Sequence, residues 1–355
     1  MRLKPVDCDV HPAVSGTRAL LPYLDGYWSD TVQMVMPGIQ QLELNSYPPG
    51  APLSVRPDWR PPQGKAAGDL AQLRTHVLDP FDVSFAICNP LFGAQVLFHD
   101  YLAAALCTAV NDWMAAEWLD REPRLRASIV VSTVDPDRAA DEIERRAADP
   151  RFVQVLLLAG SEMPLGRRYH WPIYRAAERH GLPIGIHAGS MFRHPPTQSG
   201  FPSYLAEDYA AQAQVFASQL SSLIAEGVFA KFPDLKVVLM ESGVTWLPGF
   251  MWRFGKDWRG VRSEVPWIDR PPADIVRDHV RLTIQPFDAP PDPAVVQRII
   301  EHFGSDDLLL FATDYPHWQF DGDDALPPGL PAGLVQKIMV DNAFDTYPRL
   351  KESMP

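Results

Sequence analysis

The sequence predicts an α/β protein built as a (β/α)8 barrel, the TIM-barrel architecture. Eight short apolar segments recur along the chain, each bounded by Gly, Pro, Asp or Asn. Helix-compatible segments lie between most of them, and this alternation is typical of a parallel sheet that is covered by helices. Most of the apolar runs are continuous, as expected for strands buried on both faces. A doubly wound open sheet is the alternative, but no Gly-rich phosphate loop follows the first segment.

The eight apolar segments are expected to be the strands of this barrel. In chain order they cover residues 4–11, 82–89, 126–132, 153–159, 183–189, 235–242, 280–287 and 308–315. The main helices are expected at residues 101–120, 137–148, 171–181, 210–232 and 292–304. Another helix is expected after the sixth strand, where tryptophans recur at positions 246, 252 and 258. Residues 258–274 are bounded by prolines and are expected to form a loop.

One long insertion, at about 12–81, separates the first two strands. Its most Pro-rich part covers residues 46–65, and connections of this length are either functional or disordered. The Tyr, Leu, Val and Trp side chains within it favour a packed excursion near the barrel mouth or an oligomer contact. We expect residues 1–355 to form a single barrel domain that carries this insertion.

Composition argues against several kinds of partner. The formal net charge of −12 disfavours binding to a nucleic acid. No run of about 18 apolar residues occurs, so no transmembrane helix is expected. The N-terminus lacks the basic and apolar stretches of a secretory signal. The three cysteines, at positions 8, 88 and 107, form no metal or disulfide pattern. These features predict a cytoplasmic protein.

The first strand carries three polar residues at alternate positions: Asp7, Asp9 and His11. In a strand, side chains at such positions share one face. Burying two carboxylates and an imidazole without partners is costly, so something must compensate them. A metal ion and a hydrogen-bonded buried histidine are the two alternatives at this point.

Polar residues also end three later strands. His187 ends the fifth strand, Glu241 the sixth and Asp314 the eighth, with His317 just beyond. Each alone has an ordinary explanation, such as a hydrogen-bonded core histidine, a paired buried carboxylate or a helix cap. In (β/α)8 barrels, however, catalytic groups lie at the C-terminal ends of the strands. Together with the first strand, these residues therefore predict one metal site at the barrel mouth.

Six segments spread over nearly the whole chain resemble a known superfamily in its own order. They read DCDVHP, LPIGIHAG, FPDLKVVLMESGVTWLP, LTIQPF, FATDYPH and DNAFDTYP. The pattern is similar to that of the amidohydrolase superfamily, in particular the amidohydrolase-related branch with aminocarboxymuconate semialdehyde and resorcylate decarboxylases. The resemblance implies metal ligands on strands one, five and eight, and a residue on strand six that takes part in the chemistry of the site. The matching positions are Asp9, His11, His187 and Asp314 as ligands, with Glu241 as a further ligand or base and Asp7 as a supporting group.

Two positions depart from the usual pattern of these relatives. Asp9 stands where the first-strand motif more often has His or Glu, and Glu241 stands where the decarboxylases often have His. The result is an oxygen-rich ligand set with only two histidines. Such a set favours Mn or Fe, is compatible with Zn, and is able to bridge two ions. We therefore expect one or two divalent ions: Zn, Mn or Fe.

The resemblance implies a hydrolase or non-oxidative decarboxylase that acts on a small carboxylate-bearing or aromatic molecule. In this reading Asp314 takes the proton from metal-bound water, and Glu241 or His317 relays it. A decarboxylase must also deliver a proton to carbon. With no histidine on strand six, a carboxylic acid with a strongly shifted pKa would have to serve.

Several residues outside the ligand set are candidates for contact with the substrate. Arg253 is a possible partner for a substrate carboxylate, and Trp246 and His194 are the other candidates. Where relatives often place another histidine, this chain reads YLAEDYAAQ, which includes Glu207 and Asp208. Either carboxylate is a candidate for the vicinity of the site.

Two alternatives remain open on the sequence. Some similar relatives use a dinuclear Fe or Fe/Mn site for hydroxylation, and some of these work with a paralogous subunit. The chain would then be an oxygenase, in a homo-oligomer or a hetero-oligomer. A barrel kept only as a structural partner is the second alternative, but the intact set of four ligands argues against it.

Overall fold

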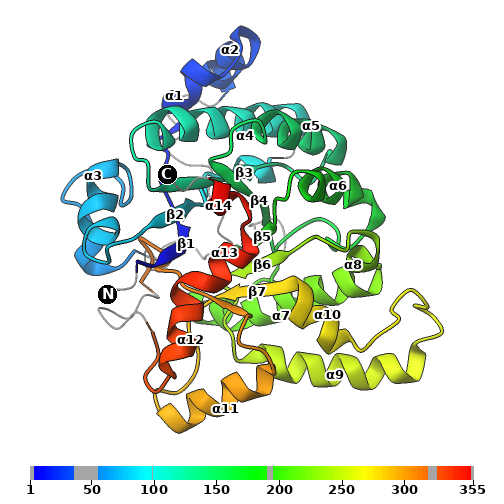
Figure 1. Cartoon of the computed structure of the whole chain (residues 1–355). Coiled ribbons are helices and arrows are strands. Elements are labelled where there is room, and N and C mark those ends of the chain that lie inside the picture. The colour runs from blue at the N-terminus through cyan, green and yellow to red at the C-terminus, as the bar shows by residue number, and fades with distance from the viewer. Residues whose placement is uncertain (1–3, 36–54, 98, 190–194, 319–325, 353–355) are drawn as a thin grey trace.

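The computed structural model describes residues 4–35, 55–97, 99–189, 195–318 and 326–352. Eight parallel strands form one sheet in chain order, with helices around its outside, which confirms the expected (β/α)8 barrel (Figure 1). Each expected strand segment overlaps an observed strand, and the starts of β3 and β4 lie one residue before the expected ones. The strands are β1 (Val6–Val10), β2 (Phe85–Cys88), β3 (Leu125–Val130), β4 (Phe152–Leu158), β5 (Ile184–His187), β6 (Val237–Met240), β7 (Val280–Thr283) and β8 (Leu309–Leu310).

The barrel closes where the last strand meets the first. The backbone N–H of Cys8 donates to the carbonyl of Phe311 at 2.9 Å, and that of His11 donates to Tyr315 at 2.8 Å. A parallel bridge joins Val10 to Tyr315. The C-terminal ends of β1 and β8, which carry candidate site residues, are therefore direct neighbours.

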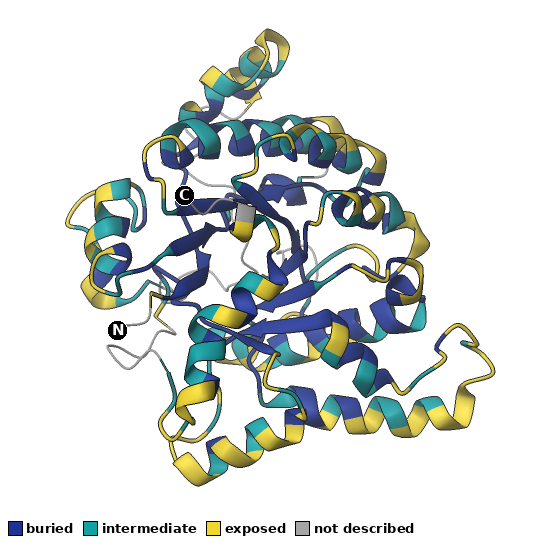
Figure 2. Ribbon diagram, viewed as in Figure 1, coloured by how far each residue is buried: buried dark blue, intermediate teal, exposed yellow. Residues whose placement is uncertain are grey.

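Burial explains the continuous apolar pattern of the strands. Every residue of the eight strands is buried, and the barrel strands form the buried centre in Figure 2. Helices cover the outer face of the sheet while side chains fill its interior, so neither face of a strand meets water. The polar residues of the strands therefore require internal partners.

The helices around the barrel agree with most of the expected segments. They are α4 (Asp100–Met114), α5 (Pro136–Arg146), α6 (Trp171–Arg179), α7 (Leu205–Ala225), α8 (Val228–Lys231), α9 (Trp246–Val261), α10 (Pro272–His279), α11 (Pro293–Phe303), α12 (Ala332–Gln336), α13 (Asn342–Thr346) and α14 (Arg349–Glu352). Capping carboxylates of Asp135 and Asp292 accept backbone N–H groups at the starts of α5 and α11, each followed by a proline.

The loop expected at residues 258–274 is shorter than predicted. Helix α9 continues to Val261, and α10 already begins at Pro272. Proline is well suited to the first turn of a helix, because that position needs no N–H donor. The prolines therefore mark the start of a helix here and not only the edge of a loop.

The insertion between β1 and β2 contains three short helices in its described part: α1 (Thr17–Leu20), α2 (Gly26–Val35) and α3 (Leu70–Leu73). Helix α2 projects from the barrel at the top of Figure 1. Val55 forms an antiparallel bridge with His317, and the N–H of Arg56 donates to Pro316 at 3.0 Å. Trp59 is buried beside them. The described insertion thus packs against the segment after β8, at the barrel mouth.

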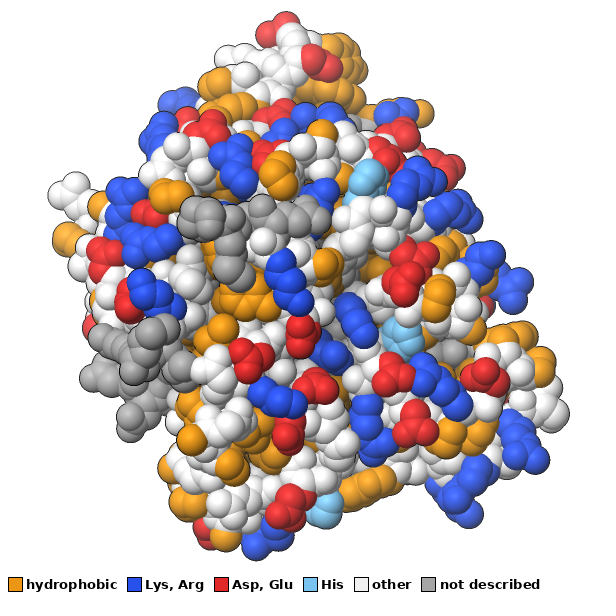
Figure 3. All heavy atoms as spheres, viewed as in Figure 1, with side chains coloured by type: hydrophobic (Ala, Val, Ile, Leu, Met, Phe, Trp, Pro, Cys, Tyr) orange, Lys and Arg blue, Asp and Glu red, His pale blue; other side chains and the backbone are white. Residues whose placement is uncertain are grey.

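The visible surface mixes charges of both signs. Acidic and basic side chains are interspersed over the face drawn in Figure 3, with apolar side chains between them. No helix among the described residues is long and apolar enough to cross a membrane.

Candidate metal centre

Four side chains meet at the mouth of the barrel: Asp9, His11, His187 and Asp314. Each offers a ligand atom, these atoms all lie within 4.8 Å of one another, and all four residues are buried. Asp9 lies in β1, His11 follows β1, His187 ends β5, and Asp314 follows β8. The structure thus brings together the four residues that the sequence singled out. They converge because all parallel strands end on the same side of the barrel.

Backbone carbonyls hold the two imidazoles in one orientation. His11 Nδ1 donates to the carbonyl of Asn89 at 2.8 Å, and His187 Nδ1 donates to the carbonyl of Ala188 at 2.5 Å. The Nε2 atoms then face the cluster: His11 Nε2 is 2.9 Å from Asp314 Oδ1, and His187 Nε2 is 3.7 Å from Asp9 Oδ2. Metal-binding histidines are held in this way, with the second ring nitrogen engaged by a neighbouring acceptor.

Three buried atoms of the cluster have no hydrogen-bond partner: Asp9 Oδ2, His187 Nε2 and Asp314 Oδ2. An unsatisfied buried polar atom costs about 1–3 kcal/mol, so three of them in one cluster need a compensating group. Two imidazoles and two carboxylates form a donor set suited to Mn, Fe or Zn. The residues present therefore fit a divalent cation.

The charges of the cluster are strongly coupled. Burial raises the pKa of Asp9 to about 6. Burial acts in the same sense on Asp314, but His317 and His11 outweigh it and hold the pKa of Asp314 below its usual range. Burial opposes a charge on His11, yet Asp9 and Asp314 raise its pKa to about 10. Burial and the neighbouring His11 lower the pKa of His187 to about 3. In the metal-free protein His187 is thus neutral and Asp314 ionised, which are the forms that bind a metal, whereas His11 is protonated and must release a proton to become a ligand.

A second group adjoins the first through Asp314. Ligand atoms of Glu241, Asp314 and His317 also lie within 4.8 Å of one another. His317 Nδ1 is 2.7 Å from Asp314 Oδ1, and Glu241 Oε2 is 3.7 Å from His187 Nε2. Burial and the charge of Asp314 raise the pKa of Glu241 well above its ordinary value. Glu241 and His317, which the sequence predicts to relay the proton, thus lie beside the four candidate ligands.

The backbone is strained at two of these positions. Glu241 has φ 56° and Asp314 has φ 55°, in the left-handed region that residues other than glycine rarely adopt. Such conformations cost on the order of 1–3 kcal/mol and concentrate at functional sites. Both residues stand where the chain leaves a strand, so the strain accompanies the turn that carries each carboxylate into the mouth.

Asp7, two residues before Asp9 in β1, is hydrogen-bonded to Thr313, the residue that precedes Asp314. Its carboxylate accepts hydrogen bonds from the N–H of Thr313 at 3.0 Å, from the Thr313 hydroxyl at 2.7 Å and from the N–H of Asp9 at 3.2 Å. Burial raises its pKa to about 7. Because Thr313 precedes Asp314, Asp7 ties the first strand to the segment that carries Asp314, in line with the expected supporting position.

Of the three candidate substrate contacts, the structure describes Arg253 and Trp246. Arg253 lies on the outer face of α9 with 84% of its side chain exposed, and it pairs with Asp257 one turn later at 3.4 Å. This exposed, ion-paired position does not favour a contact between Arg253 and the substrate, which stays a prediction. Trp246 is half-buried at the start of α9, and its indole N–H donates to Gly243 at 3.2 Å. His194 lies outside the described residues.

Of the two acidic candidates on α7, only one lies towards the centre. Glu207 accepts the N–H groups of Ser203 and Tyr204 and so caps the helix. Asp208 is buried, and its charge contributes to the raised pKa of Glu241. The helix start explains this difference, because a glutamate three residues after the cap reaches back to it.

Sequence reasoning missed Asn89. This residue follows β2, and its side-chain N–H donates to Asp9 Oδ1 at 2.8 Å while its carbonyl accepts from His11. The signal was present, because Asn89 is a polar residue at the end of a strand, like the residues that were identified. In the sequence CNP it resembles an ordinary turn residue before proline.

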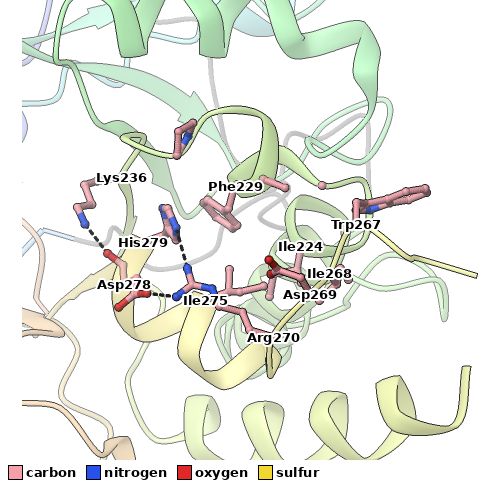
Figure 4. Close-up of a pocket in the computed structure, with 13 residues that line it drawn as sticks. Ile224, Phe229, Lys236, Trp267, Ile268, Asp269, Arg270, Ile275, Asp278 and His279 are labelled. Atoms are coloured by element: carbon pink, nitrogen blue, oxygen red, sulfur yellow. Dashed lines mark hydrogen bonds and ion pairs between the residues drawn. The ribbon is translucent and has the colours of Figure 1, made fainter. Parts of the chain in front are cut away.

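A cavity of about 380 Å³ lies away from this centre, beside α8 and α10 and near the starts of β6 and β7 (Figure 4). Arg270 pairs with Asp278 and with His279, and Lys236 donates to the carbonyl of Asp278. These polar groups therefore satisfy one another at the end of the barrel opposite to the mouth.

The fold and the site together are a (β/α)8 barrel with two histidines and two aspartates gathered at its mouth, a donor set that fits a divalent cation. The family model described as amidohydrolase matches residues 6–349. The chain belongs to this amidohydrolase family.

Two decarboxylases are similar to this chain in sequence, each at less than 30% identity. The gamma-resorcylate decarboxylase of Rhodococcus jostii (strain RHA1) is 29% identical over 223 residues, which cover 58% of this chain and 63% of that enzyme. The match thus spans less than two thirds of that relative's length. The gamma-resorcylate decarboxylase of Rhizobium sp. (strain MTP-10005) is 28% identical over 274 residues, covering 71% of this chain and 79% of that enzyme.

Solved structures share the fold over nearly the whole chain. An amidohydrolase from Mycobacterium avium subsp. paratuberculosis K-10 has a TM-score of 0.75 at 22% identity, covering 98% of this chain and 99% of that one. Dihydroxybenzoic acid decarboxylase from Polaromonas sp. JS666, which has bound manganese, has a TM-score of 0.67 at 19% identity and covers 99% of each chain.

Proposed function

We propose that the protein is a metal-dependent, non-oxidative decarboxylase of aromatic carboxylates of the resorcylate type. The observation that carries this proposal is the buried cluster of Asp9, His11, His187 and Asp314, with three unpaired ligand atoms. The names of the similar enzymes and the manganese of the Polaromonas structure support it. We propose manganese as the first ion to test, with iron and zinc as alternatives.

A divalent ion held by these four residues would supply the positive charge that orients a substrate carboxylate. Decarboxylation replaces a bond from carbon to CO₂ by a bond from carbon to hydrogen, so the site must deliver one proton to carbon. Glu241 and His317 stand beside the four ligands without belonging to that set. These two side chains are therefore placed to hold and move the proton.

Asp314 contacts both a candidate ligand, His11, and a candidate proton carrier, His317. Its Oδ1 lies at hydrogen-bond distance from both His11 and His317, while Oδ2 remains unpaired. His317 is thereby held with Nδ1 towards Asp314 and Nε2 free for another partner. We assign His317 the delivery or return of a proton at this edge of the cluster, with a carboxylate oxygen of Glu241 within 4.8 Å of the imidazole.

The proposal is tested with protein loaded with Mn²⁺ and supplied with 2,6-dihydroxybenzoate or 5-carboxyvanillate. We expect loss of the carboxylate, measured by chromatography, and one deuterium at the vacated carbon when the reaction runs in D₂O. The matched control is H187A purified in the same way, which should show no turnover. Failure of the wild-type protein to convert any hydroxybenzoate with Mn²⁺, Fe²⁺ or Zn²⁺ would exclude this function.

The other reaction classes are separated in the same assay. The relatives reported above are named decarboxylases or amidohydrolase, and none is named an oxygenase. Oxygen uptake that depends on substrate, with two equivalents of iron or manganese bound, would identify the dinuclear oxygenase. Cleavage of an amide, ester or lactone without release of CO₂ would identify a hydrolase.

We also propose that residues 1–355 form one cytoplasmic barrel domain in which about 12–81 are inserted, and that the chain forms oligomers. The partner is either a second copy or a paralogue. Light scattering coupled to gel filtration would decide this point, because a monomer has a mass of 39.7 kDa. A small-molecule substrate remains the only other partner that we propose.

A further inference from the structure

A chain of buried polar side chains runs through the barrel interior beneath the metal centre. We call it the buried amide network: Asn89, Ser128, Gln154 and Tyr347. The Tyr347 hydroxyl donates to Gln154 Oε1 at 2.9 Å, and Gln154 Nε2 donates to Ser128 Oγ at 2.8 Å and to Asn89 Oδ1 at 3.2 Å. The Ser128 hydroxyl donates to Asn89 Oδ1 at 2.6 Å. All four residues are completely inaccessible to solvent.

The network determines which way each amide points. Because the Gln154 carbonyl oxygen accepts the hydroxyl of Tyr347, its N–H₂ group faces Asn89. Because the Asn89 oxygen accepts two donors, its own N–H₂ group faces Asp9. A reversed Asn89 would place its oxygen against the Asp9 carboxylate, leave the Ser128 hydroxyl without its acceptor, and leave Gln154 Nε2 with its hydrogen bond to Ser128 but not with the one to Asn89.

This orientation has a direct consequence for the candidate ligands. Asn89 occupies Asp9 Oδ1 with a hydrogen bond of 2.8 Å, so Oδ2 is the atom left unpaired. The backbone carbonyl of the same residue accepts His11 Nδ1–H and leaves Nε2 for the cluster. One residue thus orients two ligands.

The barrel makes room for this network. Gly185 of β5 lies against Gln154: a Cβ at position 185 would stand 2.4 Å from Gln154 Nε2, a distance no side chain tolerates. Apolar side chains would fill the same space without burying polar groups, which are costly unless all are satisfied. The buried polar side chains of the network therefore need a function other than filling the barrel interior.

We propose that Asn89 is a positioning residue of the metal centre, and that Tyr347, near the C-terminus, acts on the centre through Gln154. Tyr347 belongs to the DNAFDTYP segment, for which the proposed reaction has no other use. This inference rests on the proposed metal site but not on the reaction that the site catalyses.

The test compares Mn²⁺ affinity, measured by titrating metal-free protein and following free Mn²⁺ by electron paramagnetic resonance. Loss of a hydrogen bond that supports a metal ligand typically weakens metal binding about 10–100-fold, and we expect this for N89L. Y347F removes one hydroxyl at the far end of the network, and we expect it to weaken binding by a smaller factor.

Two matched controls separate positioning from general stability. Asn111 and Tyr174 are equally buried, but Asn111 donates to Val130 and Glu142, and Tyr174 donates to Leu165, outside the network. N111L and Y174F should lower the melting temperature of the metal-free protein and retain wild-type Mn²⁺ affinity. If N89L does not fold, the comparison of Y347F with Y174F carries the test.

Unchanged Mn²⁺ affinity in Y347F and in folded N89L would overturn the inference. Equal losses of affinity in the controls and in the network variants would also overturn it. Failure of the wild-type protein to bind Mn²⁺ or Zn²⁺ is a different result, because it refutes the proposed metal site itself.

Discussion

Replacing Glu241 by glycine should make the metal-free protein more stable than replacing it by alanine. Both variants remove the carboxylate, so they differ only in how well they tolerate φ 56° at this position. A left-handed conformation costs a residue with a Cβ about 1–2 kcal/mol, and glycine avoids this cost. Glycine loses about 0.5–1 kcal/mol through its greater freedom in the unfolded chain. The difference between these two costs spans about 0–1.5 kcal/mol, and its middle, about 0.7 kcal/mol, is the advantage that we expect for E241G over E241A.

The assay is urea unfolding of the two variants in the presence of a chelator. Urea is preferred to heating, because 1 kcal/mol shifts the melting temperature of a chain of 355 residues by only about 1–2 °C. Position 249, a glycine inside α9 without positive φ, serves as a control, because G249A should be neutral or stabilising. Greater stability of E241A than of E241G would show that the backbone at Glu241 is not strained.

Three further outcomes follow from the structure. H187A should lose more than about 100-fold in Mn²⁺ affinity, measured by metal analysis after dialysis, and full retention of metal would refute the site. Burial opposes ionisation of Glu122, but hydrogen bonds from Arg124 and Arg74 lower its pKa to about 2. A depressed carboxyl pKa stabilises the fold above the unfolded value near 4.5, and a shift from 4.5 to about 2 corresponds to about 3 kcal/mol before solvent screening. With an allowance for screening, E122Q should lower the free energy of unfolding by about 2 kcal/mol at pH 7 and by progressively less from pH 4.5 towards pH 2 in urea titrations. A loss that is independent of pH would contradict this. R253A should leave kcat/KM unchanged in the decarboxylase assay, and a large rise in KM would restore Arg253 as a substrate contact.

The strands and the ligand cluster were predictable from the sequence for the same physical reason. Buried parallel strands require continuous apolar runs, so a polar residue at the end of such a run is conspicuous. His187 after PIGI and Glu241 after VVLM are identified in this way. The convergence of four strand ends then follows from the closed barrel, which needs no knowledge of side-chain packing.

Other features depend on information that a single sequence does not carry. The outward position of Arg253 depends on the rotation of α9 about its axis, and this is set by packing against the barrel. The role of Asn89 depends on which acceptors its amide finds across the barrel. The start of α10 at Pro272 was missed because proline both breaks and begins helices.

The closure of the barrel sets a time at which the metal centre becomes complete during synthesis. His11 and Asp314 are 303 residues apart in the chain, yet they meet at 2.9 Å. A ribosome that adds about 5–20 residues per second needs about 15–60 s to cover this distance. Throughout that interval Asp9 and His11 exist without the eighth strand that supplies their partner. A nascent chain that stops before residue 314 therefore lacks one of the four proposed ligands, whatever the metal supply.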